Sequence, residues 1–309
     1  MKTRNTLMWS VATMVMMLIA QPALAQKKGG GGGEAAAHTQ AGMQAAQAKN
    51  YDLAIAEFTK EIEASPKASK GYTNRGTAYR NAGKLNEAIA DFTKAIEVDP
   101  KDDLAYIGRG QTLQLQQNFP AAIADYNKVL EMKANDPAAL KLRGFANLES
   151  HVDDAAINDL SAAIQANPND VMAYRGRAAA YKDLKRYPDA INDYNKAVEL
   201  APNDADLLTK RGYVYSLAQQ YQNAINDYEG ALKVNPNDYD TVQRLQYAKG
   251  MLAAQNAPPP PPATPAPTPK PASMFTPLNI AIGLVAVIVI GIIIAVAMGR
   301  RKTTSDLYR

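Results

Sequence analysis

The clearest chemical pattern in this 309-residue chain is a pair of columns of opposite charge. Arginines recur every 34 residues, at Arg75, Arg109, Arg143, Arg177 and Arg211. Acidic residues recur with the same spacing, at Glu57, Asp91, Asp125, Asp159, Asp193 and Asp227. A row of bare guanidinium groups would bind an acidic ligand, whereas two facing rows of opposite charge would form ion pairs between packed helices. We favour ion pairs, because aligned opposite charges are more stable paired than bare.

The ends of the two columns suggest which acid meets which arginine. The first repeat has Glu57 but carries Ala41 where the arginine would stand. Pairing within a repeat would leave Glu57 without an arginine, so we predict that each acid pairs with the arginine of the following repeat. The predicted pairs are Glu57–Arg75, Asp91–Arg109, Asp125–Arg143, Asp159–Arg177 and Asp193–Arg211.

Residues for catalysis or metal binding form no recognisable arrangement in the sequence. The chain has no cysteine and only two histidines, His38 and His151, which are far apart. It lacks the common nucleophile, phosphate-loop and zinc-protease motifs. The glycine run at 29–33 has neither a preceding strand nor a following lysine, so it is a poor phosphate cradle. We therefore expect no enzyme activity, no metal and no cofactor.

The formal net charge of +4 arises at the two ends of the chain. Lys2 and Arg4 lie at one end, and a basic cluster at 300–302 lies near the other, while the body between is close to neutral. A folded body without net positive charge has no electrostatic footprint for nucleic acid, so we expect none to bind.

The 34-residue period extends to the small and apolar residues, which places the charged columns on repeated structural elements. Six units begin near residues 35, 69, 103, 137, 171 and 205. Each unit has two runs of apolar residues at three- and four-residue steps, which indicates two amphipathic helices. In the second unit, Gly76 and Ala88 leave room for the helices to cross closely, and Phe92 fills the space beside them.

Residues that favour helix starts fall where these helices should begin. Pro120 and Pro188 lie in the first turn of second helices, where a missing N–H is harmless. Asp170, Asp204 and Asp238 precede helices and are expected to be N-caps.

These patterns resemble the tetratricopeptide repeat family over about residues 35–238. The resemblance implies an all-α fold, a right-handed α-solenoid of six helix-turn-helix repeats. It further implies a concave face that is lined by the first helix of each repeat and binds other proteins, often as extended peptides. The sequence departs from the pattern at Ala134, where other repeats have proline, and at His151, which takes the turn position of Gly83. The first repeat is the weakest match.

The concave face implied by the resemblance is mixed in character, mildly basic with a few apolar side chains. Its candidate lining residues are Thr73, Thr77, Arg80, Asn81, Ile107, Gln111, Gln114, Lys141, Phe145, Leu148, Arg175, Lys182 and Tyr213. The repeated Lys/Asn arrangement with which some relatives hold a C-terminal carboxylate is missing. We expect the partner to be a protein or peptide segment with some acidic character.

The segments on either side of the repeats differ from them in composition. Residues 1–25 have a basic start, an apolar core and an A-x-A end, which predicts a cleaved signal peptide, and residues 26–34 form a Gly-rich flexible segment. Residues 239–255 continue the helical pattern as a capping helix, so the repeat domain spans 35–256. The Pro-rich segment 257–277 is interpreted as an extended linker, or alternatively as a ligand for a Pro-binding domain.

Residues 278–298 are uncharged and rich in Ile and Val, and 21 residues suffice for one transmembrane helix. The basic cluster that follows predicts that the tail at 299–309 is cytoplasmic. Gly291, Ala295 and Gly299 lie four residues apart, so they either form a face for self-association or are small residues without a partner. We expect a single-pass protein of the bacterial inner membrane with its repeats in the periplasm.

Three hypotheses for function remain open. The first is a membrane-anchored extracytoplasmic scaffold or adaptor that binds a protein or peptide on its concave face. The second is a binding module for a cell-envelope polymer. The third is a non-catalytic accessory subunit of an envelope enzyme or secretion complex.

Overall fold

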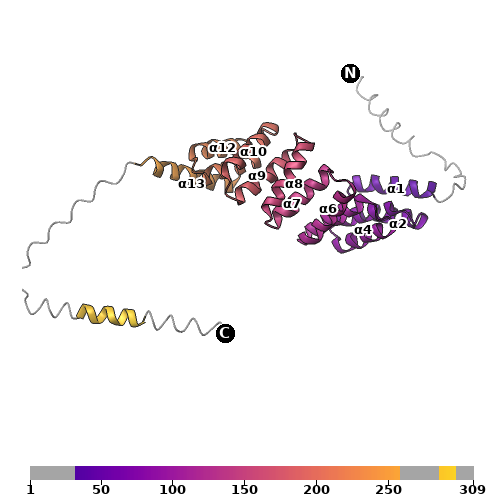
Figure 1. Ribbon diagram of the computed structural model, residues 1–309, viewed down its shortest axis with the longest axis horizontal. Coiled ribbons are helices and arrows are strands. Elements are labelled where there is room, and N and C mark those ends of the chain that lie inside the picture. The colour runs from indigo at the N-terminus through magenta and orange to yellow at the C-terminus, as the bar shows by residue number, and fades with distance from the viewer. Residues whose placement is uncertain (1–31, 258–284, 297–309) are drawn as a thin grey trace, which may run out of the picture. The chain divides into compact units, whose positions relative to one another are not determined.

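The computed structural model describes residues 32–257 and 285–296. The first range folds into helices α1 to α13, and neither range contains a strand. Six helix pairs, one for each predicted repeat, follow one another in a stack and a longer helix closes it (Figure 1). The predicted all-α solenoid of helix-turn-helix repeats with a capping helix is therefore confirmed.

The first helices of the six pairs are α1 (Gly32–Gln47), α3 (Ser69–Asn81), α5 (Asp103–Leu115), α7 (Pro137–Glu149), α9 (Val171–Asp183) and α11 (Ala205–Leu217). The second helices are α2 (Tyr51–Ala64), α4 (Leu85–Val98), α6 (Phe119–Met132), α8 (Asp153–Ala166), α10 (Tyr187–Leu200) and α12 (Tyr221–Val234). The closing helix is α13 (Tyr239–Gln255).

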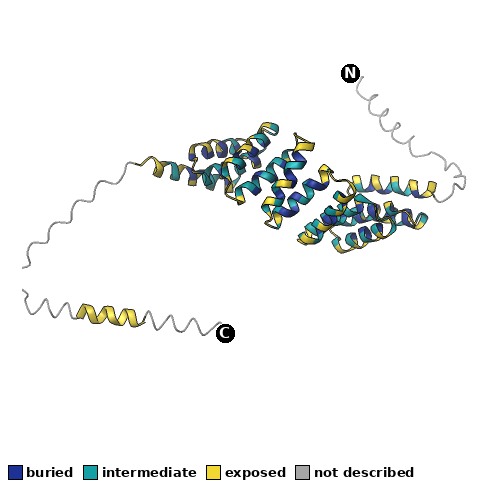
Figure 2. Ribbon diagram, in the orientation of Figure 1, coloured by how far each residue is buried: buried dark blue, intermediate teal, exposed yellow. Residues whose placement is uncertain are grey.

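Small residues on the first helices pack against large residues on the second helices of the same repeat. A Cβ atom at Gly76 would lie 3.0 Å from the ring of Phe92, and one at Gly110 would lie 2.6 Å from the ring of Tyr126. Both rings are fully buried, and the buried residues face the inside of each helix pair (Figure 2). The aromatic ring occupies the space that glycine leaves, as the sequence predicts for Gly76 and Phe92.

The ends of the helices are capped as predicted. Asp170 accepts a hydrogen bond from the backbone N–H of Ala173, and Asp204 accepts from Asp206 and Leu207. Asp238 accepts from the N–H of Thr241 at the start of α13. The predicted prolines lie in the first turns of α6 and α10.

The turn between the two helices of each repeat has one residue in the left-handed backbone region. These residues are Lys49, Gly83, Gln117, His151, Lys185 and Gln219, with φ between 58° and 77°. In the second repeat, the N–H of Lys84 reaches the carbonyl of Tyr79, which closes the helix end in a Schellman arrangement. His151 therefore adopts the same conformation as Gly83 and does not interrupt the repeat.

The first repeat folds like the others, although its sequence matches the pattern least well. Phe58 is buried and lies against Gly42, just as Phe92 lies against Gly76. Helix α1 begins at Gly32, so residues 32–34, predicted to be flexible, are helical. Glu34 in the first turn stabilises this start, because its charge complements the helix dipole.

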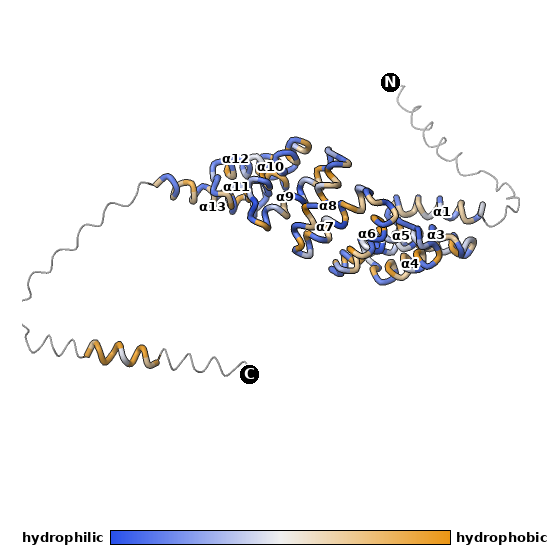
Figure 3. Tube along the Cα trace, viewed as in Figure 1, coloured by the Kyte–Doolittle hydropathy of each residue, from blue (hydrophilic) through white to orange (hydrophobic). Residues whose placement is uncertain are grey.

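The second described range, 285–296, is a single helix of Val, Ile, Ala and Gly residues and is largely hydrophobic (Figure 3). All of its residues are exposed. In residues 32–257 and 285–296, no helix is both long enough and apolar enough to cross a membrane. The remainder of the predicted span, 278–284 and 297–298, lies outside the described residues. So do the predicted signal peptide, nearly all of the Pro-rich linker and the tail.

Candidate binding face on the first helices

Each repeat packs on the next mainly through its second helix, which contacts the first helix of the following repeat, and successive first helices also contact each other. Contacts join α1 to α3, α3 to α5, α5 to α7, α7 to α9 and α11 to α13, and no comparable contact joins successive second helices of the described repeats. The hollows in the surface lie between these first helices. We call the side chains of the first helices and of α13 that line these hollows the inner face.

The charged columns form a ladder of ion pairs inside the stack, away from these hollows. Nε and Nη2 of Arg109 donate to the two oxygens of Asp125 at 2.9 and 2.7 Å, and Nη1 donates to Thr93 at 3.1 Å. The same arrangement forms the pairs Arg75–Asp91, Arg143–Asp159, Arg177–Asp193 and Arg211–Asp227. The ion-pair hypothesis is confirmed, but the predicted pairing with the following repeat is wrong.

The packing of the helix pair explains the observed pairing. Gly76 lies on the ring of Phe92, so the residues that precede them, Arg75 and Asp91, are neighbours. Glu57 does not lack a partner, because its oxygens are 2.7 Å from both Nδ1 of His38 and Nζ of Lys60. The first repeat therefore replaces its missing arginine with two other side chains.

The ladder has no free charge to offer a ligand. The hydrogen bonds that the arginines donate to the aspartates raise the pKa of Arg75, Arg109, Arg177 and Arg211, although burial acts in the opposite direction. Each of these guanidinium groups makes two hydrogen bonds to one carboxylate, the strongest geometry for such a pair. The ladder holds the repeats together and does not form the candidate site.

Three of the predicted lining residues connect adjacent repeats. The hydroxyl of Thr73 donates to Asp102 at 2.8 Å, and Nζ of Lys141 lies 2.6 Å from Asp170. Both aspartates cap the first helix of the next repeat.

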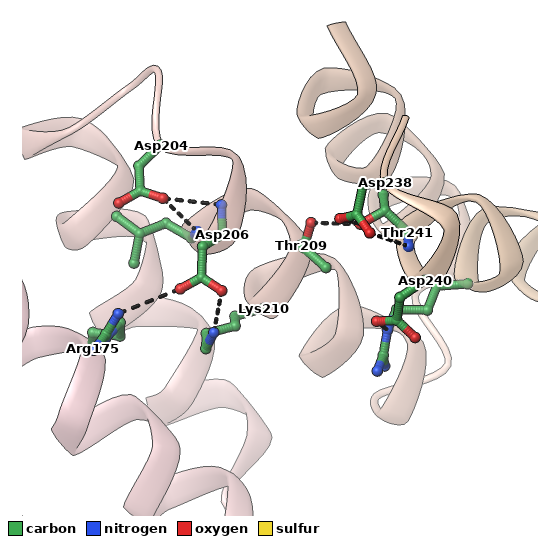
Figure 4. A network of polar contacts seen from close by, with 10 residues as sticks. Arg175, Asp204, Asp206, Thr209, Lys210, Asp238, Asp240 and Thr241 are labelled. Atoms are coloured by element: carbon green, nitrogen blue, oxygen red, sulfur yellow. Dashed lines mark hydrogen bonds and ion pairs between the residues drawn. The ribbon is translucent and has the colours of Figure 1, made fainter. Parts of the chain in front are cut away.

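Arg175 reaches forward in a similar way, to Asp206 on α11, which also binds Lys210 (Figure 4). Thr209 and Thr241 continue this row of contacts into α13.

Several other predicted lining residues contribute more to packing than to an open surface. Phe145 lies against Gly176 of the next repeat, and Leu148 packs on the core of the fourth repeat. The hydroxyl of Thr77 donates to the carbonyl of Thr73, within its own helix. Ile107 is half-buried and Asn81 is exposed at the end of α3.

The structure brings Arg80, Gln111 and Gln114 together around one hollow of about 390 Å³, which Leu115 and Glu149 complete. Nη1 of Arg80 donates to Oε1 of Gln111. Gln114 accepts from the hydroxyl of Tyr126 and donates to Glu149 at 3.2 Å. Burial lowers the pKa of Arg80, whereas the pKa values of Arg75, Arg109, Arg177 and Arg211 in the ladder are raised.

Lys182 and Tyr213 lie together at a second hollow of about 420 Å³, between α9, α11 and α13. The guanidinium of Arg244 stacks 4.7 Å from the centre of the Tyr213 ring. A neighbouring hollow, lined by Tyr213, Arg244 and the exposed Tyr247, extends this surface along α13.

Sequence reasoning missed Leu115, Arg244 and Tyr247. Tyr247 lies 34 residues after Tyr213, so continuing the period into the capping helix would have found it. Leu115 follows directly after Gln114 at the end of α5, and its 62% exposure appears only in the folded chain.

Comparison with protein families supports this arrangement. Tetratricopeptide repeat models match residues 69–102, 104–136 and 205–238, and a further TPR repeat model matches 180–219. The first and fourth repeats are not matched, yet they form the same helix pairs. The matched segments are therefore tetratricopeptide repeats, and the unmatched helix pairs share their fold. Comparison with curated proteins finds no match.

Solved structures share the fold at low sequence identity. YrrB, described as a TPR protein with an unusual peptide-binding site, is 21% identical with a TM-score of 0.53, covering 62% of this chain and 97% of that one. Pseudomonas aeruginosa pilF is 14% identical with a TM-score of 0.61, covering 72% and 99%. A tetratricopeptide repeat protein from Parabacteroides merdae is 21% identical with a TM-score of 0.53, covering 70% and 84%.

Proposed function

We propose that this chain is a scaffold that binds a protein or peptide segment on the inner face of its repeats and itself carries out no reaction. The observation that carries this proposal is the contrast between the two sets of polar groups. The ladder is closed, with each arginine held by its own aspartate. The inner face instead has open hollows with the exposed side chains of Leu115 and Tyr213 beside them.

The chemistry of this face suits an extended or helical segment. Exposed apolar residues beside hydrogen-bonding side chains are typical of surfaces that recognise peptides. The likeness to YrrB, which is described as having a peptide-binding site, supports the same class of ligand. A cell-envelope polymer is the competing ligand. Capture from membranes distinguishes the two ligands, because the experiment measures recovered protein.

In this proposal the scaffold is tethered to the inner membrane. The support comes from sequence: a basic, apolar start at 1–25, a Pro-rich segment at 257–277 and an uncharged apolar stretch at 278–298. The repeats would lie in the periplasm, held away from the bilayer by the Pro-rich segment, with the tail at 299–309 in the cytoplasm.

Capture from solubilised membranes with the full-length chain tests the binding proposal. The double variant Leu104→Ser, Leu115→Ser alters the two ends of α5, whose side chains are 63% and 62% exposed. Leu104 corresponds by repeat register to Asp206, which lines the hollow beside Tyr213. We expect recovery of the partner to fall by about tenfold, because apolar contacts at the centre of an interface carry much of its affinity.

The control is Leu53→Ser on the second helix α2, where the side chain is 48% exposed. It should leave recovery unchanged. Equal recovery with all three proteins would refute binding on the inner face, and binding of a purified cell-wall polymer in place of any protein would refute the class of ligand.

A further inference from the structure

Arg80 differs from the arginines of the ladder. Each ladder arginine makes a two-pronged contact with an aspartate of its own repeat. Arg80 lies in the last turn of α3 and has no carboxylate partner among the residues that the structure describes. Within the described part of the chain its side chain makes one hydrogen bond, from Nη1 to the side-chain oxygen of Gln111.

This leaves most of the hydrogen-bonding capacity of Arg80 unused. A guanidinium group has five N–H donors. A partly buried charge without an opposite charge is unfavourable, which agrees with the lowered pKa of Arg80. A carboxylate brought by a ligand would supply what the aspartates supply to the ladder arginines.

The lining of the hollow beside Arg80 suits a ligand that carries one acidic group next to one apolar group. Gln111 faces it with an amide N–H₂ for which the described residues supply no acceptor. Leu115 adds an exposed apolar surface to the same hollow. Glu149 stands at the rim, where its charge would repel a ligand with many acidic groups.

We propose that Arg80, with Gln111, forms a subsite for a single carboxylate of the bound segment, whose neighbouring apolar side chain packs on Leu115. This inference rests on the proposed function and names one group of its ligand. The carboxylate has two sources, an acidic side chain or the C-terminus of a chain. Both would make the same pair of N–H···O contacts with Arg80.

Nuclear magnetic resonance of the full-length chain with ¹⁵N-labelled arginine tests the subsite. The probes are the blocked peptide acetyl-Leu-Glu-Leu-amide, its glutamine counterpart, and acetyl-Leu-Gln-Leu with a free terminal carboxylate. We expect the Nε–H signal of Arg80 to report a dissociation constant about tenfold lower for one carboxylate peptide than for the blocked glutamine peptide. The tighter of the two identifies the source.

Two results would overturn the carboxylate assignment. One is equal binding of all three peptides. The other is inorganic phosphate that shifts the Arg80 signal at the same concentration as the better carboxylate peptide, because the site would then be a general anion site.

Variants show whether the preference depends on Arg80. Arg80→Gln should abolish it, whereas Arg186→Gln should not, because Arg186 is exposed and pairs with Asp189 at 2.9 Å outside the hollow. Glu149→Gln keeps Arg80 in place and should strengthen carboxylate binding several-fold, because it removes the repulsion at the rim. Unchanged or weaker binding to Glu149→Gln would contradict the proposal even if Arg80→Gln did not fold.

Capture of the partner distinguishes a failure of the carboxylate subsite from a failure of the proposed function. If Arg80→Gln still captures the partner that Leu104→Ser, Leu115→Ser loses, the carboxylate subsite is wrong and the scaffold stands. If neither the double variant nor Arg80→Gln changes capture, both proposals fail.

Discussion

One arginine in each repeat after the first joins three helices. Arg109 lies on α5, pairs with Asp125 on α6 of its own repeat, and reaches Thr93 on α4 of the preceding repeat. The partner in the preceding repeat is always a small polar side chain, 16 residues upstream: Thr59, Thr93, Asn127, Ser161 and Asn195. These contacts fix the angle between repeats as well as the pairing within them.

Replacing Arg109 by glutamine should lower the free energy of unfolding by about 3 kcal/mol, because it leaves the buried carboxylate of Asp125 without an opposite charge. Chemical denaturation of the wild type and variant measures the difference. Arg109→Met combined with Asp125→Leu should cost less than the single change, since no charge is left unpaired. A single change that costs under about 1 kcal/mol would contradict this role.

In five of the six repeats the turn residue with positive φ is not glycine, so its backbone is strained. His151 has φ 58°, a region that glycine adopts at little cost and other residues adopt rarely. His151→Gly should therefore raise the free energy of unfolding by about 0.5–1 kcal/mol. Gly83→Ala, with φ 77° and open space around it, should lower it by a similar amount. The same effect from both changes would show that the backbone conformation is not the cause.

At the scale of the elements, the period of the sequence predicted the helix pairs, because small and large residues pack together at equivalent positions in every repeat. Gly76 and Phe92 occupy fixed places in their helices, so the spacing of small and large residues gives both helices and their contact. The period could not distinguish pairing within a repeat from pairing between repeats, because each arginine lies between two acids at similar sequence distance. The packing of the two helices of a repeat, which places Arg75 beside Asp91, decides between them.

The candidate site was less predictable than the fold for a related reason. A position on the inner face of a first helix can point into a hollow or reach the cap of the next helix. Lys141 and Arg80 are both basic residues of the predicted face. Lys141 forms an ion pair with Asp170, whereas Arg80 has no carboxylate partner among the described residues. Exposure of Leu115 likewise depends on which neighbours cover it.

The contact between Lys141 and Asp170 makes the junction of the fourth and fifth repeats sensitive to acid. Burial acts to raise the pKa of Asp170, but the hydrogen bonds from Lys141 and the N–H of Ala173 outweigh it and hold that pKa below its usual range. Ionised Asp170 therefore stabilises the fold above the unfolded pKa of about 4, and this contribution is lost as the pH falls through the lower, folded value.

Asp170→Asn should accordingly destabilise the chain by about 1 kcal/mol at pH 7 and by progressively less below about pH 4. Lys141→Ile, which copies Ile107 of the preceding repeat, should show the same convergence. Chemical denaturation at pH 7 and at pH 3 measures the free energy of unfolding of each variant. A loss of stability that is equal at pH 7 and pH 3 would rule out the ion pair as the cause.

At the scale of the whole chain, our proposal combines a recognition domain with a membrane tether. The chain has no cysteine, so a single cysteine can be placed at will and labelled. In intact cells with a permeable outer membrane, a maleimide that does not cross the inner membrane should label Lys128→Cys on α6. It should not label Ser305→Cys in the tail until the cells are lysed. Labelling of Ser305→Cys before lysis, or protection of Lys128→Cys, would contradict the proposed topology.

The central claim is that the inner face of the repeats is where the partner binds. Photo-crosslinking in living cells tests it most directly. Benzoylphenylalanine is placed at Leu115 or at Gln243, which lines the hollow beside Tyr247 on α13, or at Lys128 or Lys196 on the second helices. Leu115, Gln243 and Lys128 are exposed and the side chain of Lys196 is 38% exposed, so each position can carry the probe. We predict that a protein is crosslinked from the two inner positions and from neither outer one. A partner crosslinked only from Lys128 and Lys196 would contradict the account.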